Sequence, residues 1–550
     1  MLHLPYFHHL PASTEQPENF TELKRIFYLS ICLTLGFTFP VAICQTHDLH
    51  VSFSSNFGGS DKEEFFGGDA CSDGGFVLAG LSPSIDFDIS QPAYDSANVF
   101  IVKCDSNGDK IWSRTYGGNS YDKARYIFED SNGDLIFIGG TQSSDGDINY
   151  NRGNSDLMVA KLNQDGDIKW LKTYGGSDYE GGRYITETSD GGYIFCGYSS
   201  SDDFDVASGG RGKHDGWLTK LDIDGNIVWT NTFGGDWIDR IRWCVELPDH
   251  GYIFAGQTGS DTLDCTGNHG NSDVWAGRVD SQGNLMWSKQ FGGSGTERAY
   301  HISKTTTGTF IITGQTNSND FDVSENNGGF DGWILELDID GNLIWEHAVG
   351  GSNNEHLFRT YETSDGGLIS AGSSASDDHD VLDLECKAGD SFLLMKHDNF
   401  RKLEWAKCSG GSKSDVCNEL IVLENDEYVL MGDSKSDDGD VKLNYGEYDY
   451  WIVKLAPPTP IDTITPSLNF TAFYDQNTKT LVIESFVEQT VYISITTMDG
   501  KIVTTKRPVQ ISPGTNQSPL NISSLTSLGI YHVVLEGTES NYTLRIPVLK

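Results

Sequence analysis

Basic side chains are scarce in this chain. Its 550 residues include 38 Lys and Arg against 79 Asp and Glu, which gives a formal net charge of -41 at pH 7. A protein with this charge repels phosphate backbones and anionic lipid headgroups. The composition therefore disfavours binding to nucleic acid or directly to a membrane surface, whereas cations and neutral glycans are compatible with it.

Short motifs of catalysis and cofactor binding are also missing. The sequence has no GxSxG, HExxH, P-loop or dinucleotide fingerprint and no CxxC pair, and its 14 His are scattered without partners at metal-ligand spacing. An enzyme can still assemble its site from distant segments. The question of catalysis stays open, and the balance favours a non-catalytic protein.

The apolar stretch near the N-terminus is too short for a typical membrane span. It covers residues 27–43, fewer than the ~20 residues that cross a bilayer as a helix. Lys24 and Arg25 precede it, and the small residues Ala42 and Cys44 lie at its end, just before Gln45. This pattern predicts a cleaved signal peptide over residues 23–44, with a membrane anchor as the alternative.

Cysteine follows no regular pattern either. Eight of the ten Cys lie beyond residue 45, and they fall at no fixed place in the repeat described below. They therefore do not form a disulfide framework of regular spacing. An oxidising compartment would still allow single bridges, and Cys408 with Cys417, which flank one short loop, are the best candidates.

Glycine and aromatic residues, by contrast, are abundant and recur in register. The first Gly of a Gly-Gly pair returns every 58 to 60 residues, at Gly58, Gly117, Gly175, Gly234, Gly292, Gly350 and Gly410. An aromatic residue lies five positions before each pair, and a second Gly column has the same period. A fourth column reads Asn98, Asp156, Asp215, Asp273, Asp331, Asp390 and Asp449. Four columns thus agree on seven repeats.

Each repeat holds four strand-length segments, which we name a, b, c and d. In one repeat they are residues 183–189, 193–199, 216–222 and 226–233. The a-to-b turn reads SDGG and the c-to-d turn reads DIDGN, and tight turns use Asp for side-chain hydrogen bonds and Gly for a positive φ. Four short strands in a radially repeated unit are typical of a β-propeller. The predicted fold is all-β, a seven-bladed propeller with four-stranded blades.

The phase of the repeat predicts how the ring closes. The repeat region begins with a single d-like strand at residues 51–57, and its last copy stops after strand c at residues 451–455. These fragments add up to one blade. We expect them to pair, because pairing removes the exposed strand edges at the seam.

One turn departs from its column. The c-to-d turn contains Gly in five repeats, at Gly108, Gly166, Gly225, Gly283 and Gly341, but Arg401 takes this place in the sixth full repeat. A positive φ is unfavourable for Arg. We therefore predict that this turn is irregular.

The repeat also resembles a known family. Segments of the type DGGYIF-x-G, W-x-K-x-FGG and D-x-W-x-x-K-L-D are similar to secreted bacterial β-propeller repeats over about residues 46–456. This resemblance implies the architecture and implies no activity.

The composition changes sharply after residue 456. A Pro-rich linker at residues 457–469 leads into residues 470–550, which contain six basic and six acidic side chains and no Trp or Cys. Alternating runs such as VYISITTMDGKIV and GIYHVVLEG predict a small, immunoglobulin-like antiparallel β-sandwich. Together with the terminal LRIPVLK they resemble the type A C-terminal sorting domain of the type IX secretion system of Bacteroidota. The resemblance implies that the secretion machinery binds residues 470–550 and delivers the protein to the cell surface or the medium.

The predicted domain order follows from these boundaries. It comprises an N-terminal extension of uncertain role (1–22), the signal peptide (23–44), the propeller (45–456), the linker (457–469) and the sorting domain (470–550). The mature protein is expected to have no transmembrane segment.

One acidic column lies five residues after the first Gly of each pair, in the d-to-a connection. It consists of Glu63, Asp122, Glu180, Asp239, Glu297, Glu355 and Asp415. These residues could form a carboxylate-lined mouth of the ring. The favoured interpretation is that they fasten the loop, either by accepting N–H bonds of the Gly-Gly turn or by pairing with Arg125, Arg183 or Arg242.

A second acidic pattern, D-x-D, lies in the b-to-c connection. Its last Asp recurs in every repeat, and clustered carboxylate and carbonyl oxygens suit Ca²⁺. The candidate calcium ligands are Asp145, Asp147, Asp203, Asp205, Asp438 and Asp440. The alternative is that Asp and Ser of these loops cap turns through their own backbone. We predict no other cofactor and no catalytic residue.

The long, variable d-to-a and b-to-c connections emerge on one face of a propeller, and we expect binding there. The leading hypothesis is a non-catalytic cell-surface or secreted protein, an adhesin or glycan-binding module with a glycan or protein ligand. The alternatives are a propeller enzyme that processes polysaccharide or peptide, and a structural surface-coat protein. A carboxylate or His pair that breaks the repeat symmetry would favour the enzyme, whereas equivalent pockets in all blades would favour a lectin.

Overall fold

The computed structural model describes residues 49–548, with gaps at 90–95, 207–209, 383, 385, 387–388, 458–469, 476–479, 486–488, 498–501, 513, 520–528 and 537–540. The predicted signal peptide at 23–44 and almost all of the linker lie outside the described residues. The chain divides into two compact units, of which the first ends at Leu455 and the second contains the C-terminal strands. None of the helices among the described residues is long and apolar enough to cross a membrane.

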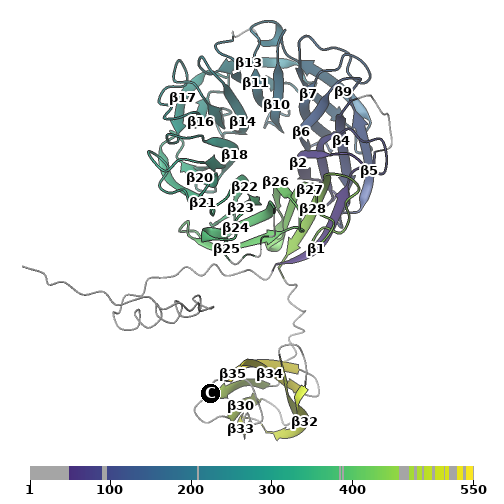
Figure 1. Ribbon diagram of the computed structural model, residues 1–550, viewed down its shortest axis with the longest axis vertical. Coiled ribbons are helices and arrows are strands. Elements are labelled where there is room, and N and C mark those ends of the chain that lie inside the picture. Colours follow the sequence, from purple (N-terminus) through teal and green to yellow (C-terminus); the bar gives the residue numbers. More distant parts are fainter. Residues whose placement is uncertain are drawn as a thin grey trace, which may run out of the picture. The chain divides into compact units, whose positions relative to one another are not determined.

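The first unit is a seven-bladed β-propeller, as the repeat predicted (Figure 1). Every blade is a four-stranded sheet, and its a–b and b–c strand pairs are antiparallel. The a strands are β2 (Glu64–Ala70), β6 (Asp122–Glu129), β10 (Glu180–Glu187), β14 (Asp239–Glu246), β18 (Arg298–Lys304), β22 (Glu355–Glu362) and β26 (Asp415–Val422). The b strands are β3 (Phe76–Ser82), β7 (Leu135–Thr141), β11 (Tyr193–Ser199), β15 (Tyr252–Thr258), β19 (Phe310–Thr316), β23 (Leu368–Ser374) and β27 (Tyr428–Ser434).

The outer half of each blade consists of strands c and d. The c strands are β4 (Asn98–Cys104), β8 (Asp156–Leu162), β12 (Asp215–Leu221), β16 (Asp273–Val279), β20 (Asp331–Leu337), β24 (Ser391–His397) and β28 (Asp449–Ala456). The d strands are β5 (Lys110–Tyr116), β9 (Ile168–Tyr174), β13 (Ile227–Phe233), β17 (Leu285–Phe291), β21 (Leu343–Val349), β25 (Leu403–Ser409) and β1 (His50–Phe57). Three short 3₁₀ helices lie in the connections: η1 (Phe204–Val206), η2 (His379–Val381) and η3 (Glu424–Asp426). We number the blades 1 to 7 in the order of their a strands.

Strands b and c are buried along almost their whole length because neighbouring blades cover both of their faces. Strand c of four blades carries a fully buried Trp, namely Trp217, Trp275, Trp333 and Trp451. The a strands lie innermost, and each of them packs against the a strands of both neighbouring blades (Figure 1). The seven a strands therefore form the wall of a central channel.

The predicted closure of the ring is confirmed. The seventh sheet has the strand order β1-β28-β27-β26, so the first strand of the described chain completes the last blade. The indole of Trp451 donates to the Ser54 hydroxyl at 3.0 Å, and that hydroxyl donates to the carbonyl of Asp440 at 2.7 Å. Strand β1 is thus held to blade 7 by side chains as well as by the sheet.

The predicted irregular turn in blade 6 is wrong. Arg401 adopts a φ of 67°, close to the 75° of Gly225, and its turn makes the same two backbone hydrogen bonds as the turn of blade 3. The Arg401 side chain compensates for the unfavourable backbone conformation, because its guanidinium binds Glu336 of blade 5 at 2.9 Å and the carbonyl of Gly366 at 3.0 Å. This turn therefore requires a residue with a positive φ, but that residue need not be glycine.

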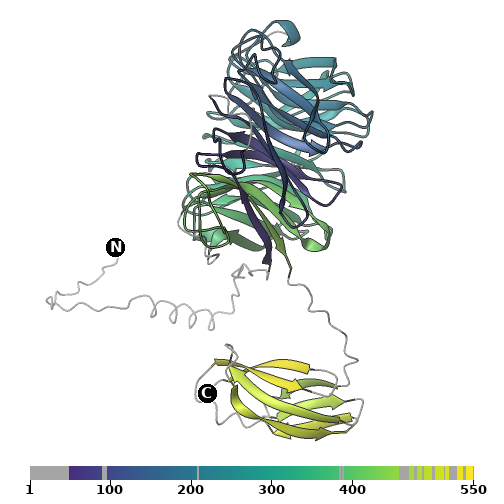
Figure 2. The same cartoon turned by 90° about the vertical axis from the view of Figure 1, so that its right-hand side faces the viewer.

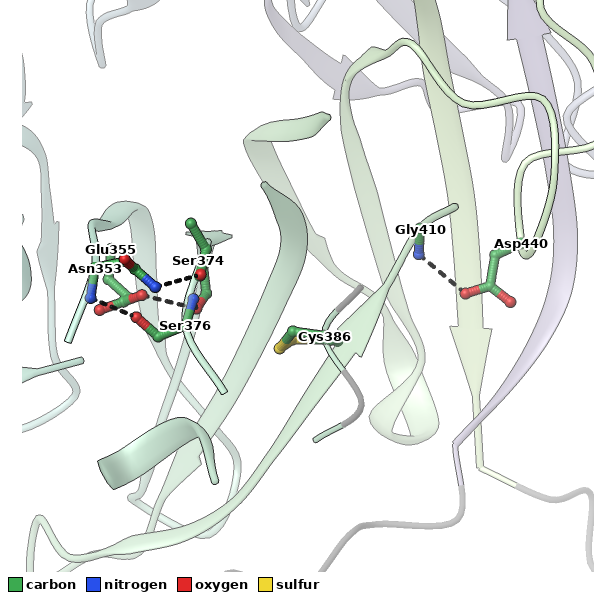
Figure 3. The surroundings of a disulfide bond; sticks show 9 residues. Asn353, Glu355, Ser374, Ser376, Cys386, Gly410 and Asp440 are labelled. Atoms are coloured by element: carbon green, nitrogen blue, oxygen red, sulfur yellow. Dashed lines mark hydrogen bonds between the residues drawn. A yellow bond between two sulfur atoms is a disulfide. The ribbon is translucent and has the colours of Figure 1, made fainter. Parts of the chain in front are cut away.

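The expected disulfide between Cys408 and Cys417 is wrong as well. Cys408, on the outer strand β25, bonds instead to Cys386 of the b-to-c connection of the same blade, with the two Cα atoms 5.3 Å apart. Cys417 lies on the innermost strand of the next blade and is fully buried there as a free thiol. The short loop between Cys408 and Cys417 separates an outer strand from an inner one. Figure 3 shows the surroundings of this disulfide.

The second unit contains β29 (Phe470–Asp475), β30 (Thr480–Ser485), β31 (Gln489–Thr497), β32 (Ile502–Ile511), β33 (Gly514–Pro519), β34 (Gly529–Glu536) and β35 (Asn541–Val548). These strands form two sheets, with the orders β29-β30-β33 and β32-β31-β34-β35 (Figure 2, yellow-green). Neighbouring strands in both sheets are antiparallel. The immunoglobulin-like assignment and the sorting role stay predictions.

Candidate functional site

The acidic column of the d-to-a connection fastens loops, as the favoured interpretation held. Glu180 accepts the N–H of Gly176 at 2.8 Å and the hydroxyls of Ser199 and Ser201 at 2.6 and 2.7 Å. In blade 6, Glu355 makes the same contacts with Gly351 and Ser374 (Figure 3). The remaining five accept the N–H of the second Gly of their own pair, namely Glu63, Asp122, Asp239, Glu297 and Asp415. The ion pairs of the described residues join none of the seven to Arg125, Arg183 or Arg242.

The D-x-D carboxylates of the b-to-c connections bind the backbone of the neighbouring Gly-Gly turn. The first Asp accepts an N–H two residues beyond the first Gly, as Asp145, Asp203 and Asp438 do at 2.8, 2.8 and 2.6 Å. The second Asp accepts the N–H of the first Gly itself, as Asp147, Asp205 and Asp440 do at 3.1, 3.3 and 3.1 Å (Figure 3 shows Asp440). The alternative interpretation expected these side chains to cap turns through their own backbone. They do cap a turn, but that turn belongs to the d-to-a connection 26 to 30 residues earlier in the chain.

The structure does not gather these six candidate ligands at one place, since they come from three different blades. Among the described residues, no group of three or more His, Cys, Asp or Glu is arranged to hold a metal ion. Asp205 also forms an ion pair with Arg152. Calcium binding therefore stays a prediction that the geometry does not require.

A different column of the repeat breaks its symmetry. Each a strand contains a β-bulge at the same place, where the pairing with strand b skips one residue. A bulge adds an unpaired residue and re-aims its side chain. The seven skipped residues are Phe66, Arg125, Arg183, Arg242, Tyr300, Phe358 and Asn418. They differ from blade to blade, whereas the fasteners three residues earlier are always acidic.

All seven bulge residues line one cavity of about 120 Å³ in the central channel. Trp243 and Arg359 complete its lining. A second cavity of about 110 Å³ shares Arg125 and Arg183 and extends past Lys123, Gln142 and Tyr198. Because the bulge lies in the first half of strand a, both cavities lie toward the face with the d-to-a and b-to-c connections. We name the two together the central cup.

The floor of the cup is filled by buried side chains that meet across the channel axis. Tyr126 of blade 2 contacts Trp243 of blade 4, with ring centroids 5.2 Å apart, and the Arg359 guanidinium of blade 6 lies 4.2 Å from the Trp243 ring. Contacts between blades that are not neighbours must cross the axis. Arg359 is itself neutralised by Glu419, at 2.6 and 2.7 Å. The cup is therefore closed at one end.

The three bulge arginines lack a carboxylate partner among the described residues. The Arg125 guanidinium lies 3.9 Å from the centre of the Phe66 ring, and that of Arg242 lies 5.0 Å from Tyr300 and donates to Gln257 at 2.9 Å. The Nε atoms of Arg183 and Arg242 are buried without a hydrogen-bond partner. Burial, followed by the charge of the neighbouring Arg183, lowers the pKa of Arg125 and Arg242 to about 9, so both are still protonated at pH 7.

The recurring columns of the sequence do not predict this site. Arg125, Arg183 and Arg242 were expected as partners of the fasteners, because the fasteners are acidic in every repeat and the bulge residues are not alike. The sequence does contain a signal for this site, which is a column that varies between repeats. Three residues after each fastener, this column reads Phe, Arg, Arg, Arg, Tyr, Phe and Asn. Because this position varies while the rest of the innermost strand is regular, the scaffold does not require a particular residue there.

The fold and this site define a class, a seven-bladed β-propeller with a basic, one-ended central cup. No family model matches the chain, and no curated protein is similar to it. Solved structures to which the chain is similar include the WD40 domain of Neurospora crassa Pan2, at 10% identity and a TM-score of 0.40, covering 76% of this chain and 98% of that chain. Others are YCF48 bound to D1 peptide, at 10% identity, 77% and 100% coverage and a TM-score of 0.41, and a member of the DUF4221 family from Bacteroides vulgatus, at 8% identity, 74% and 100% coverage and 0.31. These likenesses concern the fold alone.

Proposed function

We propose that this chain is an exported, non-catalytic binding protein of the cell surface or the medium, and that its ligand enters the central cup. The observation that carries the proposal is the bulge column, since it places seven side chains of four different types around one cavity of an otherwise regular ring. No carboxylate or His lines the cavity of about 120 Å³, and Glu180, which lines the second cavity, already accepts hydrogen bonds from Gly176, Ser199 and Ser201. Binding is the function that this lining supports.

The route of export belongs to the same proposal. The repeats would be of the secreted bacterial type, residues 23–44 would direct the chain across the inner membrane, and residues 470–550 would be the cargo signal of a type IX secretion machinery. The sequence patterns described above support this route. Calcium at Asp145, Asp147, Asp203, Asp205, Asp438 and Asp440 is an accessory proposal, and a melting temperature that rises with Ca²⁺ and falls with a chelator would support it.

A ligand screen with a blocked cup tests the binding proposal. The wild-type propeller, residues 45–456, is applied to glycan and protein arrays beside the variant Asn418→Trp, whose indole would occupy the cup. Ile344→Trp is the matched control, because Ile344 is 55% exposed on the outer strand β21. We expect the wild type and Ile344→Trp to bind the same ligand and Asn418→Trp to lose it. Undiminished binding by Asn418→Trp would contradict a ligand in the cup.

A further inference from the structure

The cup concentrates positive charge inside a strongly acidic protein. Arg125, Arg183 and Arg242 face one cavity in a chain whose formal net charge is -41. Like charges this close repel one another, and the charge of Arg183 adds to burial in lowering the pKa of Arg125 and Arg242. The nearest internal ion pair, Arg359 with Glu419, is already complete. Folding alone gives no reason to keep three unpaired guanidinium groups together.

Two features of these arginines point to a missing oxyanion. The buried Nε atoms of Arg183 and Arg242 have no acceptor, and a buried donor without a partner is costly. Guanidinium groups bind carboxylate, sulfate and phosphate through two parallel N–H bonds. Phe66 and Tyr300 hold the Arg125 and Arg242 groups from one side, which reduces the entropy that binding would cost.

The rest of the lining limits what can carry the oxyanion. The two cavities are lined by Arg, Lys, Tyr, Phe, Trp, Gln, Asn, Ser, Glu and Gly, and by no Leu, Ile, Val, Met or Ala. Aromatic faces with amide and hydroxyl groups suit a ring that has C–H faces and hydroxyl edges. An aliphatic peptide side chain or an acyl chain would find no apolar partner of its own kind.

The size of the cup and its closed floor indicate that a compact group of the ligand enters it. Cavities of about 120 and 110 Å³ that share two arginines hold one compact group and no polymer passing through. A chain ligand would therefore enter with its end. The surrounding negative charge would repel a long polyanion, and this repulsion reaches about 10 Å at 0.1 M salt. A ligand with a single charge at its end avoids most of this repulsion.

We propose that the central cup binds the terminal uronate of an acidic saccharide, with its carboxylate held by Arg125, Arg183 and Arg242. This inference rests on the proposed function and names the ligand class of the same site. The pyranose ring would lie among Tyr198, Tyr300 and the amide of Asn418.

Calorimetry and thermal shift with small probes test the ligand class. D-Glucuronate and D-glucose are compared on the full-length wild-type protein at one ionic strength, together with inorganic sulfate and with acetyl-diglycine as its free acid and its amide. We expect glucuronate alone to bind measurably. Arg183→Gln should weaken it about 10- to 100-fold, the effect of losing one charge-assisted bidentate contact. Arg278→Gln is the matched control, since Arg278 also has a buried, unpartnered Nε but lies outside the cup, and it should bind as the wild type does.

The outcomes separate this inference from the proposed function. Equal binding of glucuronate and glucose, or unchanged affinity in Arg183→Gln, would overturn the oxyanion site. Sulfate or the peptide acid binding as well as glucuronate would overturn the saccharide class. If an array ligand is lost in Asn418→Trp while no oxyanion binds, the inference fails and the proposed function stands. If neither experiment yields a ligand, both fail.

Discussion

A buried Asp at the start of strand c faces the fastener in most blades. The Oδ1 atoms of Asp215, Asp273 and Asp331 have no partner among the described residues, while their other oxygen accepts a backbone N–H. Burial, and then the charge of the neighbouring fastener, raises the pKa of all three to about 6. Blade 1 carries Asn98 at this position, which shows that the scaffold accepts a neutral side chain there.

These carboxyls predict that the propeller is more stable at pH 5 than at pH 8. Their pKa of about 6 in the folded state lies above the unfolded value of about 3.9. The folded state therefore holds these protons more tightly, and the stabilisation present near pH 4 is lost as the pH rises through 6. Each residue contributes on the order of 2 kcal/mol across that window. Chemical denaturation at a series of pH values measures the effect.

The control for this prediction separates the buried pairs from the general negative charge. The triple variant Asp215→Asn, Asp273→Asn and Asp331→Asn should flatten the profile between pH 5 and 8. Asp340→Asn, at an exposed turn position, should leave it nearly unchanged. An unaltered profile in the triple variant would assign the pH dependence to the surface.

At the scale of the element, replacing Arg401 in the c-to-d hairpin of blade 6 has two opposing effects on the stability of the protein. Arg401→Gly would relieve the left-handed strain of about 1 kcal/mol, but it would leave the buried Glu336 carboxylate without its guanidinium. Breaking a buried pair costs more, about 3 kcal/mol. We therefore expect Arg401→Gly to destabilise the protein by about 2 kcal/mol in urea unfolding.

The same substitution in a protein that lacks the ion pair tests this explanation. In a Glu336→Gln protein the ion pair is already absent, so Arg401→Gly should become neutral or stabilising. The same loss in both backgrounds would show that the turn, and not the pair, needs Arg401.

The strands were predictable because their pattern is local. The expected strand b at residues 193–199 coincides with β11, and the closing strand expected at residues 51–57 lies within β1. Turn residues and apolar runs determine such segments directly. The bulge is different, since it exists only in the register between two strands, and nothing in the a strand alone marks Arg183 as the skipped residue. The Cys386–Cys408 bridge likewise depends on the path of a connection.

At the scale of the whole molecule, the two compact units predict independent folding. A chain that ends at residue 456 keeps all 28 propeller strands, from β1 to β28. We expect it to melt as the full chain's propeller does. In the native cell the truncated protein should remain in the compartment enclosed by the outer membrane, because it lacks the proposed sorting signal. Immunodetection on intact cells measures this, and normal surface display of the truncated protein would contradict the sorting role.

The seam of blade 7 also constrains the order of events in synthesis. Strand β1 is made first among the propeller strands, yet it pairs with β28, which is made last. Contacts between segments so distant in sequence form slowly, because a long loop must close first. The ring therefore cannot close until Ala456 has left the ribosome. Until then β1 has no partner, and an exported chain could cross the inner membrane before its most distant contact commits it to a folded shape.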